Sequence, residues 1–185
     1  DQDPRVRYYL ALTMGHLGDK RALPVLTEAL NDTQVENQIY TLWALGSIGD
    51  NSAVPGVLKQ LRHDDAAVRK VAAYVLGSFK DESAIHDLQV ALNDVNNEVQ
   101  WNAAMSLALL GDASGAELLT KLLDRSYVEG LDAFTVQQKT ELMVNAVKCL
   151  AAIKHEPARD KIAELSRNDS NLAVRDASLE ALKKY

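Results

Sequence analysis

Hydrophobic residues recur along most of this chain at intervals of three and four positions, and no stretch alternates apolar with polar residues. Such spacing places the apolar side chains on one side of a helix with 3.6 residues per turn. A clear example is formed by Val68, Val71, Ala72, Val75, Leu76 and Phe79. Shorter apolar segments that end in polar residues precede these longer ones. The pattern predicts an all-α chain built of helical hairpins.

The predicted hairpins repeat with a fixed period. Gly-Asp occurs at 18–19, 49–50 and 111–112, and Lys80-Asp81 fills the missing place, so successive turns are 31 residues apart. A period of this length is typical of stacked helical repeats. Glycine suits a left-handed C-cap at the end of a helix, and Asp or Asn can cap the N–H groups at the start of the next.

The segment 65–81 resembles the pattern D-x-x-V-R-x-x-A-A-x-A-L-G-x-I-G-D of HEAT-like repeats of the phycobilisome-lyase type, and the other copies match more loosely. Departures include Gln100 and Met143 in the Arg position and a shifted Val35. The resemblance covers essentially the whole chain and implies an α-solenoid of 31-residue HEAT-like helical hairpin repeats. It also implies that the second helix of each hairpin lines the concave face. These concave helices are expected to begin near Pro4, Val35, Ala66, Asn97, Val136 and Leu172.

We expect residues 1–185 to form a single HEAT-like repeat domain of about five to six repeats. The chain opens with Asp-Gln-Asp-Pro in the middle of a repeat and ends on a concave-type helix. Such ends are typical of a segment of a longer protein.

One insertion breaks the period. From Gly111 to Lys154 the spacing is 43, so 12 extra residues lie near 126–138. Thr135 followed by Gln138 has the pattern of a capping box, which predicts a helix beginning at the next position. The remaining residues, about 126–134, are predicted to form a loop that contacts a ligand or merely lengthens a turn.

Aromatic residues gather at concave positions that the core does not use. The first four concave helices have sixteen such positions, of which six are aromatic, against four aromatic residues elsewhere. We expect a partner surface, since Trp and Tyr are enriched at interface hot spots. The alternative is that the rings complete the core. The candidate partner-binding residues are Tyr8, Tyr9, Leu12, His16, Tyr40, Trp43, Lys70, Tyr74, Trp101, Asn102 and Met105, with Tyr127 and Phe134 on the insertion.

The last two concave helices are polar and ringless at the same positions, so we place the centre of contact in the first four repeats. These positions are Val144, Asn145, Lys148 and Ala152, then Asp176, Ala177, Glu180 and Lys184.

Neither metal chemistry nor hydrolysis is indicated. The four histidines lie at different repeat phases, so none forms the helical ligand pair of a metal site. His155-Glu156 is the one His-Glu pair of the kind that related hydroxylases use, and we expect it in an exposed turn. Cys149 occupies a small packing position, and Ser47 and Ser78 share their repeat phase with no His and Asp, so we predict no catalytic residue.

Three arginines occupy the Arg position of the repeat pattern: Arg7, Arg69 and Arg175. In the family this side chain bridges to Asp groups of adjacent turns. The resemblance therefore implies a structural role for them.

Composition and charge narrow the function further. The chain is 47% hydrophobic, and no run approaches the roughly 18 apolar residues of a membrane span, so no membrane insertion is expected. A formal net charge of −6 disfavours a nucleic-acid partner. A single cysteine fits a reducing compartment, and we predict a cytoplasmic location. The sequence does not indicate the oligomeric state.

The preferred function is a non-catalytic scaffold or adaptor that binds a protein or peptide on an aromatic-rich concave face, without a cofactor. The resemblance keeps open a bilin-lyase or chaperone-like subunit that holds a tetrapyrrole or its carrier protein. A nucleic-acid reader is a third reading, but it needs a Lys/Arg-lined groove, and only Lys70 and Lys148 qualify.

Overall fold

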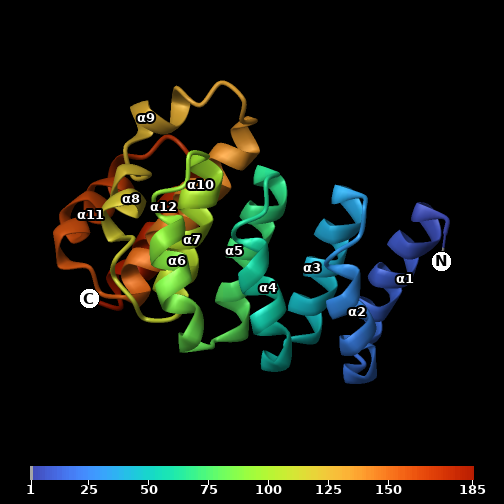
Figure 1. Cartoon of the computed structure of the whole chain (residues 1–185). Helices are drawn as coiled ribbons and strands as arrows, with labels where there is room; N and C mark the ends of the chain where they lie inside the picture. Colours follow the sequence, from blue (N-terminus) through green and yellow to red (C-terminus); the bar gives the residue numbers. More distant parts are fainter. Residues whose placement is uncertain (1) are drawn as a thin grey trace. The chain divides into compact units, whose positions relative to one another are not determined.

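The computed structural model describes residues 2–185, and within these the secondary structure is entirely helical (Figure 1). Four short 3-10 helices, Lys20–Ala22, Asn51–Ala53, Glu82–Ala84 and Glu156–Ala158, precede shorter helices of the hairpins. The α-helices are α1 (Pro4–Leu17), α2 (Leu23–Ala29), α3 (Val35–Ile48), α4 (Val54–Gln60), α5 (Ala66–Phe79), α6 (Ile85–Ala91), α7 (Asn97–Leu109), α8 (Ala116–Lys121), α9 (Arg125–Glu129), α10 (Val136–Ala152), α11 (Arg159–Asn168) and α12 (Leu172–Leu182).

The fold-class prediction of an all-α array of helical hairpins is confirmed. All six predicted starts of the second helices coincide with the starts of α1, α3, α5, α7, α10 and α12. The chain divides into two compact units, the N-terminal unit Asp1–Ser106 and the C-terminal unit Leu107–Tyr185, with the boundary inside α7. That residues 1–185 form a single domain stays a prediction.

Left-handed residues mark the repeating turns, as the sequence predicts. Gly18, Gly49 and Gly111 have φ values of 64°, 66° and 81°. Lys80, which replaces the glycine of one repeat, adopts the same conformation at φ 55°, and Lys154 does so after the insertion at φ 49°. The turn geometry is therefore kept even where a side chain makes the left-handed region less favourable.

Aspartates begin the structure that follows these turns. The carboxylates of Asp19, Asp50 and Asp81 each accept a hydrogen bond from the backbone N–H two residues later, at 2.9 Å, 3.0 Å and 2.9 Å. Asp65 caps α5 in the same way, at 2.7 Å. These bonds satisfy N–H groups that lack a partner within the helix.

Small residues let the second helices of the N-terminal unit approach closely. A Cβ on Gly15 would lie 2.7 Å from the Ala44 Cα, and one on Gly77 would lie 2.5 Å from the Ser106 Oγ. The Ser106 hydroxyl in turn donates to the Ala73 carbonyl at 2.7 Å. Glycine is required there because the neighbouring backbone leaves no room for a side chain.

Arginine–aspartate pairs tie one hairpin to the turn of the next. Arg7 Nη2 donates to Asp32 Oδ1 at 2.9 Å, and Arg69 Nη2 donates to Asp94 Oδ1 at 3.0 Å. The structural role implied for these two arginines is confirmed. Arg175 differs, since its guanidinium donates to the Asp169 backbone carbonyl at 2.6 Å and not to a carboxylate.

The glutamines at the Arg position use the same backbone acceptor. Gln38 Nε2 donates to the Asp32 carbonyl at 2.8 Å, and Gln100 Nε2 donates to the Asp94 carbonyl at 2.6 Å. An amide therefore keeps the contact to the turn but gives up the ion pair.

The insertion in the C-terminal unit is more ordered than the predicted loop. Residues 125–129 form α9, because the Asp124 carboxylate accepts from Ser126 N and Tyr127 N and because Val128 is fully buried. The prediction of a loop over 126–134 is wrong for this part. The capping box of Thr135 and Gln138 is confirmed at the start of α10.

Helix α9 supplies an arginine for the turn before α12, because the repeat position on α10 holds Met143. Arg125 forms an ion pair with Asp169, whose side chain is only 2% exposed, and its Nε lies 3.2 Å from Asp169 Oδ2. The insertion therefore supplies the arginine that the repeat position supplies elsewhere.

Candidate functional site

Five aromatic rings of the N-terminal unit touch or adjoin one another across successive second helices. The rings of Tyr8 and Tyr40 meet edge to face with centroids 4.3 Å apart, and Tyr8 also meets Tyr9 at 4.8 Å. Trp43 and Tyr74 lie 5.1 Å apart. Tyr40 and Trp43 are three residues apart on α3, which places them on the same side of that helix. We call this set the ring face.

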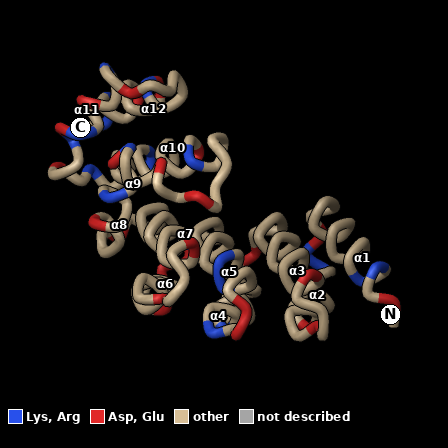
Figure 2. Tube along the Cα trace, turned by 90° about the horizontal axis from the view of Figure 1, so that it is seen from above, with Lys and Arg blue, Asp and Glu red and all other residues tan. Residues whose placement is uncertain are grey.

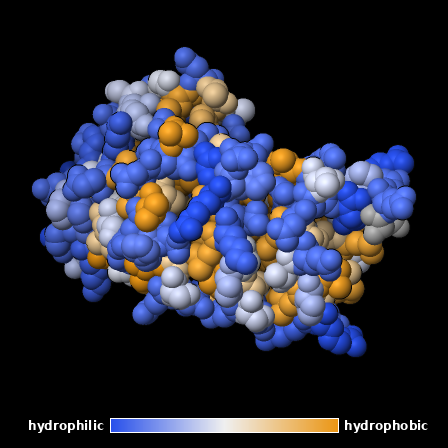
Figure 3. Space-filling model, viewed as in Figure 1, coloured by the Kyte–Doolittle hydropathy of each residue, from blue (hydrophilic) through white to orange (hydrophobic). Residues whose placement is uncertain are grey.

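The ring face is open to solvent over much of its length. Tyr9 is 63% exposed, Tyr74 is 50% exposed and Trp43 is 41% exposed, while Tyr8 and Tyr40 are half-buried. On the face drawn in Figure 3, hydrophobic residues lie singly or in small groups among hydrophilic ones. Single exposed apolar residues need no function, whereas large contiguous apolar patches are typical of interaction surfaces.

Few charges interrupt the ring face. Glu36 is the only charged residue of α3, whose trace is tan along most of its length in Figure 2. The pKa of the Tyr8 hydroxyl is raised, first by its hydrogen bond with Tyr40, then by burial and by neighbouring charges that include Glu36. The Tyr8 hydroxyl therefore stays neutral near pH 7.

Polar contacts border the rings on the α5 and α7 side. Lys70 Nζ lies 2.9 Å from Glu98 Oε2, so this cation is paired, and Asn102 Nδ2 donates to the Glu98 carbonyl at 2.7 Å. Leu12 and Met105 are half-buried, and His16 is exposed with its Nδ1 3.1 Å from the Leu12 carbonyl. Their part in binding stays a prediction.

Trp101 does not belong to the open surface. It is only 4% exposed, so the expectation that its ring is accessible to a partner is wrong. An indole buries a large apolar area when packed between helices, which favours the covered position. The alternative that rings complete the core therefore holds for Trp101 but not for Trp43.

The insertion residues Tyr127 and Phe134 belong to the C-terminal unit, and both are half-buried. Lys121 Nζ lies 4.4 Å from the centroid of the Tyr127 ring, which is a cation–π contact within the unit. A binding role for these two residues stays a prediction.

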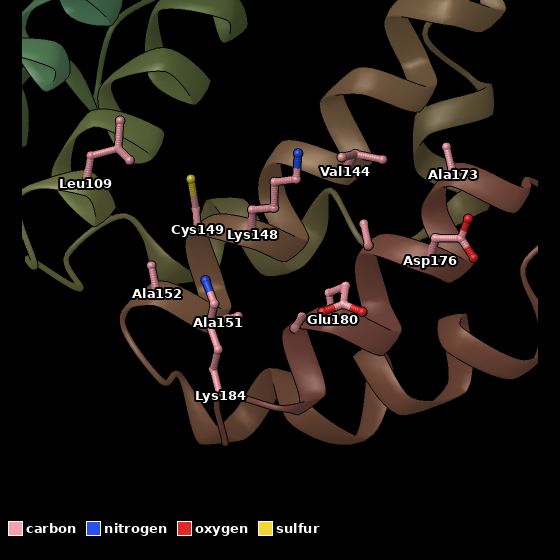
Figure 4. Close-up of a pocket in the computed structure, with 12 residues that line it drawn as sticks. Leu109, Val144, Lys148, Cys149, Ala151, Ala152, Ala173, Asp176, Glu180 and Lys184 are labelled. Atoms are coloured by element: carbon pink, nitrogen blue, oxygen red, sulfur yellow. The ribbon is translucent and has the colours of Figure 1, made fainter.

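A groove that the sequence reading passed over lies in the C-terminal unit. It has a volume of about 670 Å³ and runs between α10 and α12 (Figure 4). The sequence pattern places the centre of contact in the first four repeats, because α10 and α12 are polar and ringless at the concave positions. Small residues at four-residue spacing, Ala173, Ala177 and Ala181, were the signal, because alanines leave space between helices unfilled, and Ala177 stands where α3 has Tyr40.

The residues with reactive side chains are arranged as packing or capping groups. Cys149 is buried, and burial raises the pKa of its thiol to about 11, with Lys148 opposing the shift. The Ser78 hydroxyl donates to the Val75 carbonyl at 2.7 Å. Within residues 2–185 no group of three or more His, Cys, Asp or Glu side chains is placed to hold a metal ion.

The His155 turn is less exposed than predicted. The side chain is half-buried, and its Nε2 is buried without a hydrogen-bond partner. Tyr185 packs against the same turn, since its hydroxyl lies 3.2 Å from the carbonyl oxygens of both Leu150 and His155.

Among the described residues, no helix is both long and apolar enough to cross a membrane. The cytoplasmic location stays a prediction.

A model of HEAT repeats matches residues 1–59 and 54–137, which together span more than half of the sequence. The chain belongs to the HEAT repeat family. The predicted resemblance to HEAT-like repeats is therefore confirmed. A comparison with curated proteins returned no match.

Solved structures of helical repeat proteins share the fold of this HEAT repeat chain. The complex of CpcE and CpcF of phycocyanin lyase from Nostoc sp. PCC7120 is 22% identical, with a TM-score of 0.57 over 98% of this chain and 83% of that one. A designed armadillo repeat protein in complex with the peptide (KR)4 is 18% identical, with a TM-score of 0.62 over 97% and 90%. At these identities the likeness concerns the fold.

Proposed function

We propose that this protein is a non-catalytic scaffold that binds a protein or peptide partner on the ring face of its N-terminal unit. The observation that supports this most directly is the open pair of Trp43 and Tyr74, which bridges α3 and α5 at 5.1 Å while each ring stays at least 41% exposed. Rings fixed by neighbouring rings offer a large contact area with little loss of side-chain entropy.

The size of the surface favours a macromolecular partner. A fully covered aromatic side chain buries about 150–250 Å², so partial covering of five rings amounts to a few hundred square ångströms. That area fits the centre of a protein–protein interface, with the polar contacts of Lys70 and Glu98 at its border.

Two proteins of similar fold are consistent with a protein or peptide partner. One is a repeat protein with a bound peptide, and the other is a complex of two chains of a lyase. The first suggests that such an array can present a peptide-binding surface, and the second keeps the tetrapyrrole-holding subunit as the alternative to be tested.

Peptides selected on the full chain from a random displayed library provide the test. Trp43→Ala should weaken binding of the selected peptides by about 2–4 kcal/mol, as truncation of an interface hot spot does. The matched control is Val90→Ala, because Val90 is also exposed, at 57%, but lies on α6. It should leave affinity unchanged.

Two outcomes would contradict the proposal. Equal affinities for wild type and Trp43→Ala would move the partner surface away from the ring face. A change in visible absorbance on adding a bilin, abolished by Trp43→Ala, would favour the tetrapyrrole alternative. Because the rings are uncharged, peptide affinity should also fall only modestly as salt rises to the physiological range.

A further inference from the structure

The groove between α10 and α12 is lined mainly by small or apolar side chains. Along α12 the stripe runs from Ala173 through Ala177 and Ala181, and Val144 and Ala152 face it from α10. Figure 4 shows these residues with the charged side chains of both helices around the same opening. The groove is lined entirely by residues of the C-terminal unit.

The groove occupies the positions at which the N-terminal unit carries rings. By repeat phase, Ala177 and Glu180 of α12 correspond to Tyr40 and Trp43 of α3. Loss of an aromatic side chain from such a position leaves space that the backbone does not close by itself. Large apolar side chains from another molecule can therefore enter where this chain supplies none.

The charges around the groove are incompletely paired. Glu180 Oε1 lies 2.6 Å from Lys183 Nζ, so this carboxylate is already paired. Lys148, Lys184 and Asp176 also line the groove but form no ion pair within residues 2–185. Two ammonium groups and one carboxylate are thus available, and the excess charge is positive.

We propose that this groove binds an acidic amphipathic segment of a protein partner, whose large apolar side chains enter the groove while its carboxylates pair with Lys148 and Lys184. The site is separate from the ring face and does not rest on the function proposed for it.

The shape of the groove favours a segment over a small molecule. The stripe from Ala173 to Ala181 spans about 12 Å at 1.5 Å per helical residue, or about two turns of helix. The charged groups are distributed along this length, whereas small-molecule sites bring a few polar groups to one point.

Three labelled peptides of matched length serve as probes. The first has leucines at helical spacing and glutamates on its polar face, and in the other two glutamine or lysine replaces every glutamate. The full chain should bind the glutamate peptide most tightly and the lysine peptide least. Lys148→Glu should weaken binding of the glutamate peptide by about tenfold, since a favourable charge contact becomes repulsive.

Arg167→Glu is the matched control. Arg167 is exposed on α11 and lies outside the groove. Its replacement by Glu changes the net charge by the same amount as Lys148→Glu. It should leave affinity for the glutamate peptide within about twofold. Trp43→Ala should have no effect either, which separates this site from the ring face.

Alkylation of Cys149 can show whether a peptide occupies the groove. Cys149 is the only cysteine of the chain and lines the groove, so its alkylation reports on this site alone. The glutamate peptide should slow alkylation of Cys149, measured by mass spectrometry, and the lysine peptide should not.

Several outcomes would overturn the proposal. These are no binding of the glutamate peptide, equal binding of the glutamate and lysine peptides, or equal losses in Lys148→Glu and Arg167→Glu. Binding that leaves Cys149 alkylation unchanged would place the peptide elsewhere. Octanoate that both protects Cys149 and displaces the peptide would make the groove a site for small carboxylates.

Discussion

The two units place different side chains at equivalent positions of their second helices. In the N-terminal unit these positions hold Tyr40, Trp43 and Tyr74, whose rings contact neighbouring rings. In the C-terminal unit Ala177 stands at the position of Tyr40, and a groove of about 670 Å³ lies there instead. One repeat plan thus produces a surface of projecting rings in one unit and a recess in the other.

The difference shows which positions of a repeat are free to change. In the N-terminal unit the close approach of second helices depends on Gly15 and Gly77, and the core depends on buried leucines such as Leu42, Leu45 and Leu76. The ring positions belong to neither set, so they can vary with little effect on the array.

The two units also differ in net charge. Residues 1–106 contain nine Lys and Arg against 14 Asp and Glu, whereas residues 107–185 contain 11 against 12. The N-terminal unit is therefore the acidic one, although its ring face is almost uncharged. The nearly balanced C-terminal unit leaves two lysines unpaired in its groove.

The largest expected effect separates the two tryptophans. Trp101→Ala should lower the free energy of unfolding by about 3–5 kcal/mol, because the indole is 4% exposed and its removal leaves a cavity. Trp43→Ala should cost about 1 kcal/mol or less, since its ring is 41% exposed. Denaturant unfolding followed by circular dichroism measures both. Similar losses would mean that Trp43 is also core, and the contrast between the units would fail.

A second prediction concerns the insertion of the C-terminal unit. Arg125→Ala should destabilise this unit by about 2–3 kcal/mol, because it leaves the buried Asp169 carboxylate without its cation. Arg62→Ala is the control in the N-terminal unit, where the pair with Asp87 has an arginine side chain that is 79% exposed. It should cost about 0–1 kcal/mol.

Hydrogen exchange resolved by residue shows in which unit each substitution lowers stability. A single unfolding curve cannot show this when two units unfold separately. An insertion that serves only as a surface loop would show no loss of protection for Arg125→Ala.

The sequence predicted the helices well because local chemistry sets them. The capping carboxylates, the left-handed turn positions and the apolar period agree with one another, and all six second helices begin where expected. Lys80 was placed in the turn by period alone, and its φ of 55° confirms this.

What the sequence could not predict depends on contacts between distant residues. The period locates Trp101 and Trp43 at similar positions, but only the packing of neighbouring helices decides that one is covered. Helix α9 was missed because its anchors are Val128, buried by the rest of the unit, and Asp169, which lies 44 residues from Arg125. The groove was missed because alanines signal an unfilled space only after the helices are placed.

A third prediction uses pH to test the arginine pairs. The hydrogen bonds from Arg7 lower the pKa of the Asp32 carboxyl from 3.8 to about 2, and its side chain is 4% exposed. A depressed carboxyl pKa stabilises the fold fully above pH 3.8, and this contribution is lost as the pH falls through about 2. It amounts to about 2 kcal/mol.

Arg7→Met should remove most of the pH dependence of stability in α1–α3 and leave that of the C-terminal unit unchanged. Hydrogen exchange across the acid range measures both. The same acid dependence in wild type and variant would show that the pair contributes little to stability.

The smallest expected effect concerns a feature that the units share. Within residues 2–185, each unit has one left-handed turn residue with a side chain, Lys80 in the N-terminal unit and Lys154 in the C-terminal unit. Lys80→Gly and Lys154→Gly should each raise stability by about 0.5–1 kcal/mol, because glycine adopts this conformation without steric cost, although its greater freedom in the unfolded chain offsets part of the gain. Lys59→Gly, inside α4, is the opposite control and should lower stability by about 1 kcal/mol. Since the turn geometry is the same in both units, the two gains should be equal within about 0.5 kcal/mol. A gain confined to one unit would show that its turn is held by contacts beyond the repeat, and the units would then differ in their backbone as well as in their surfaces.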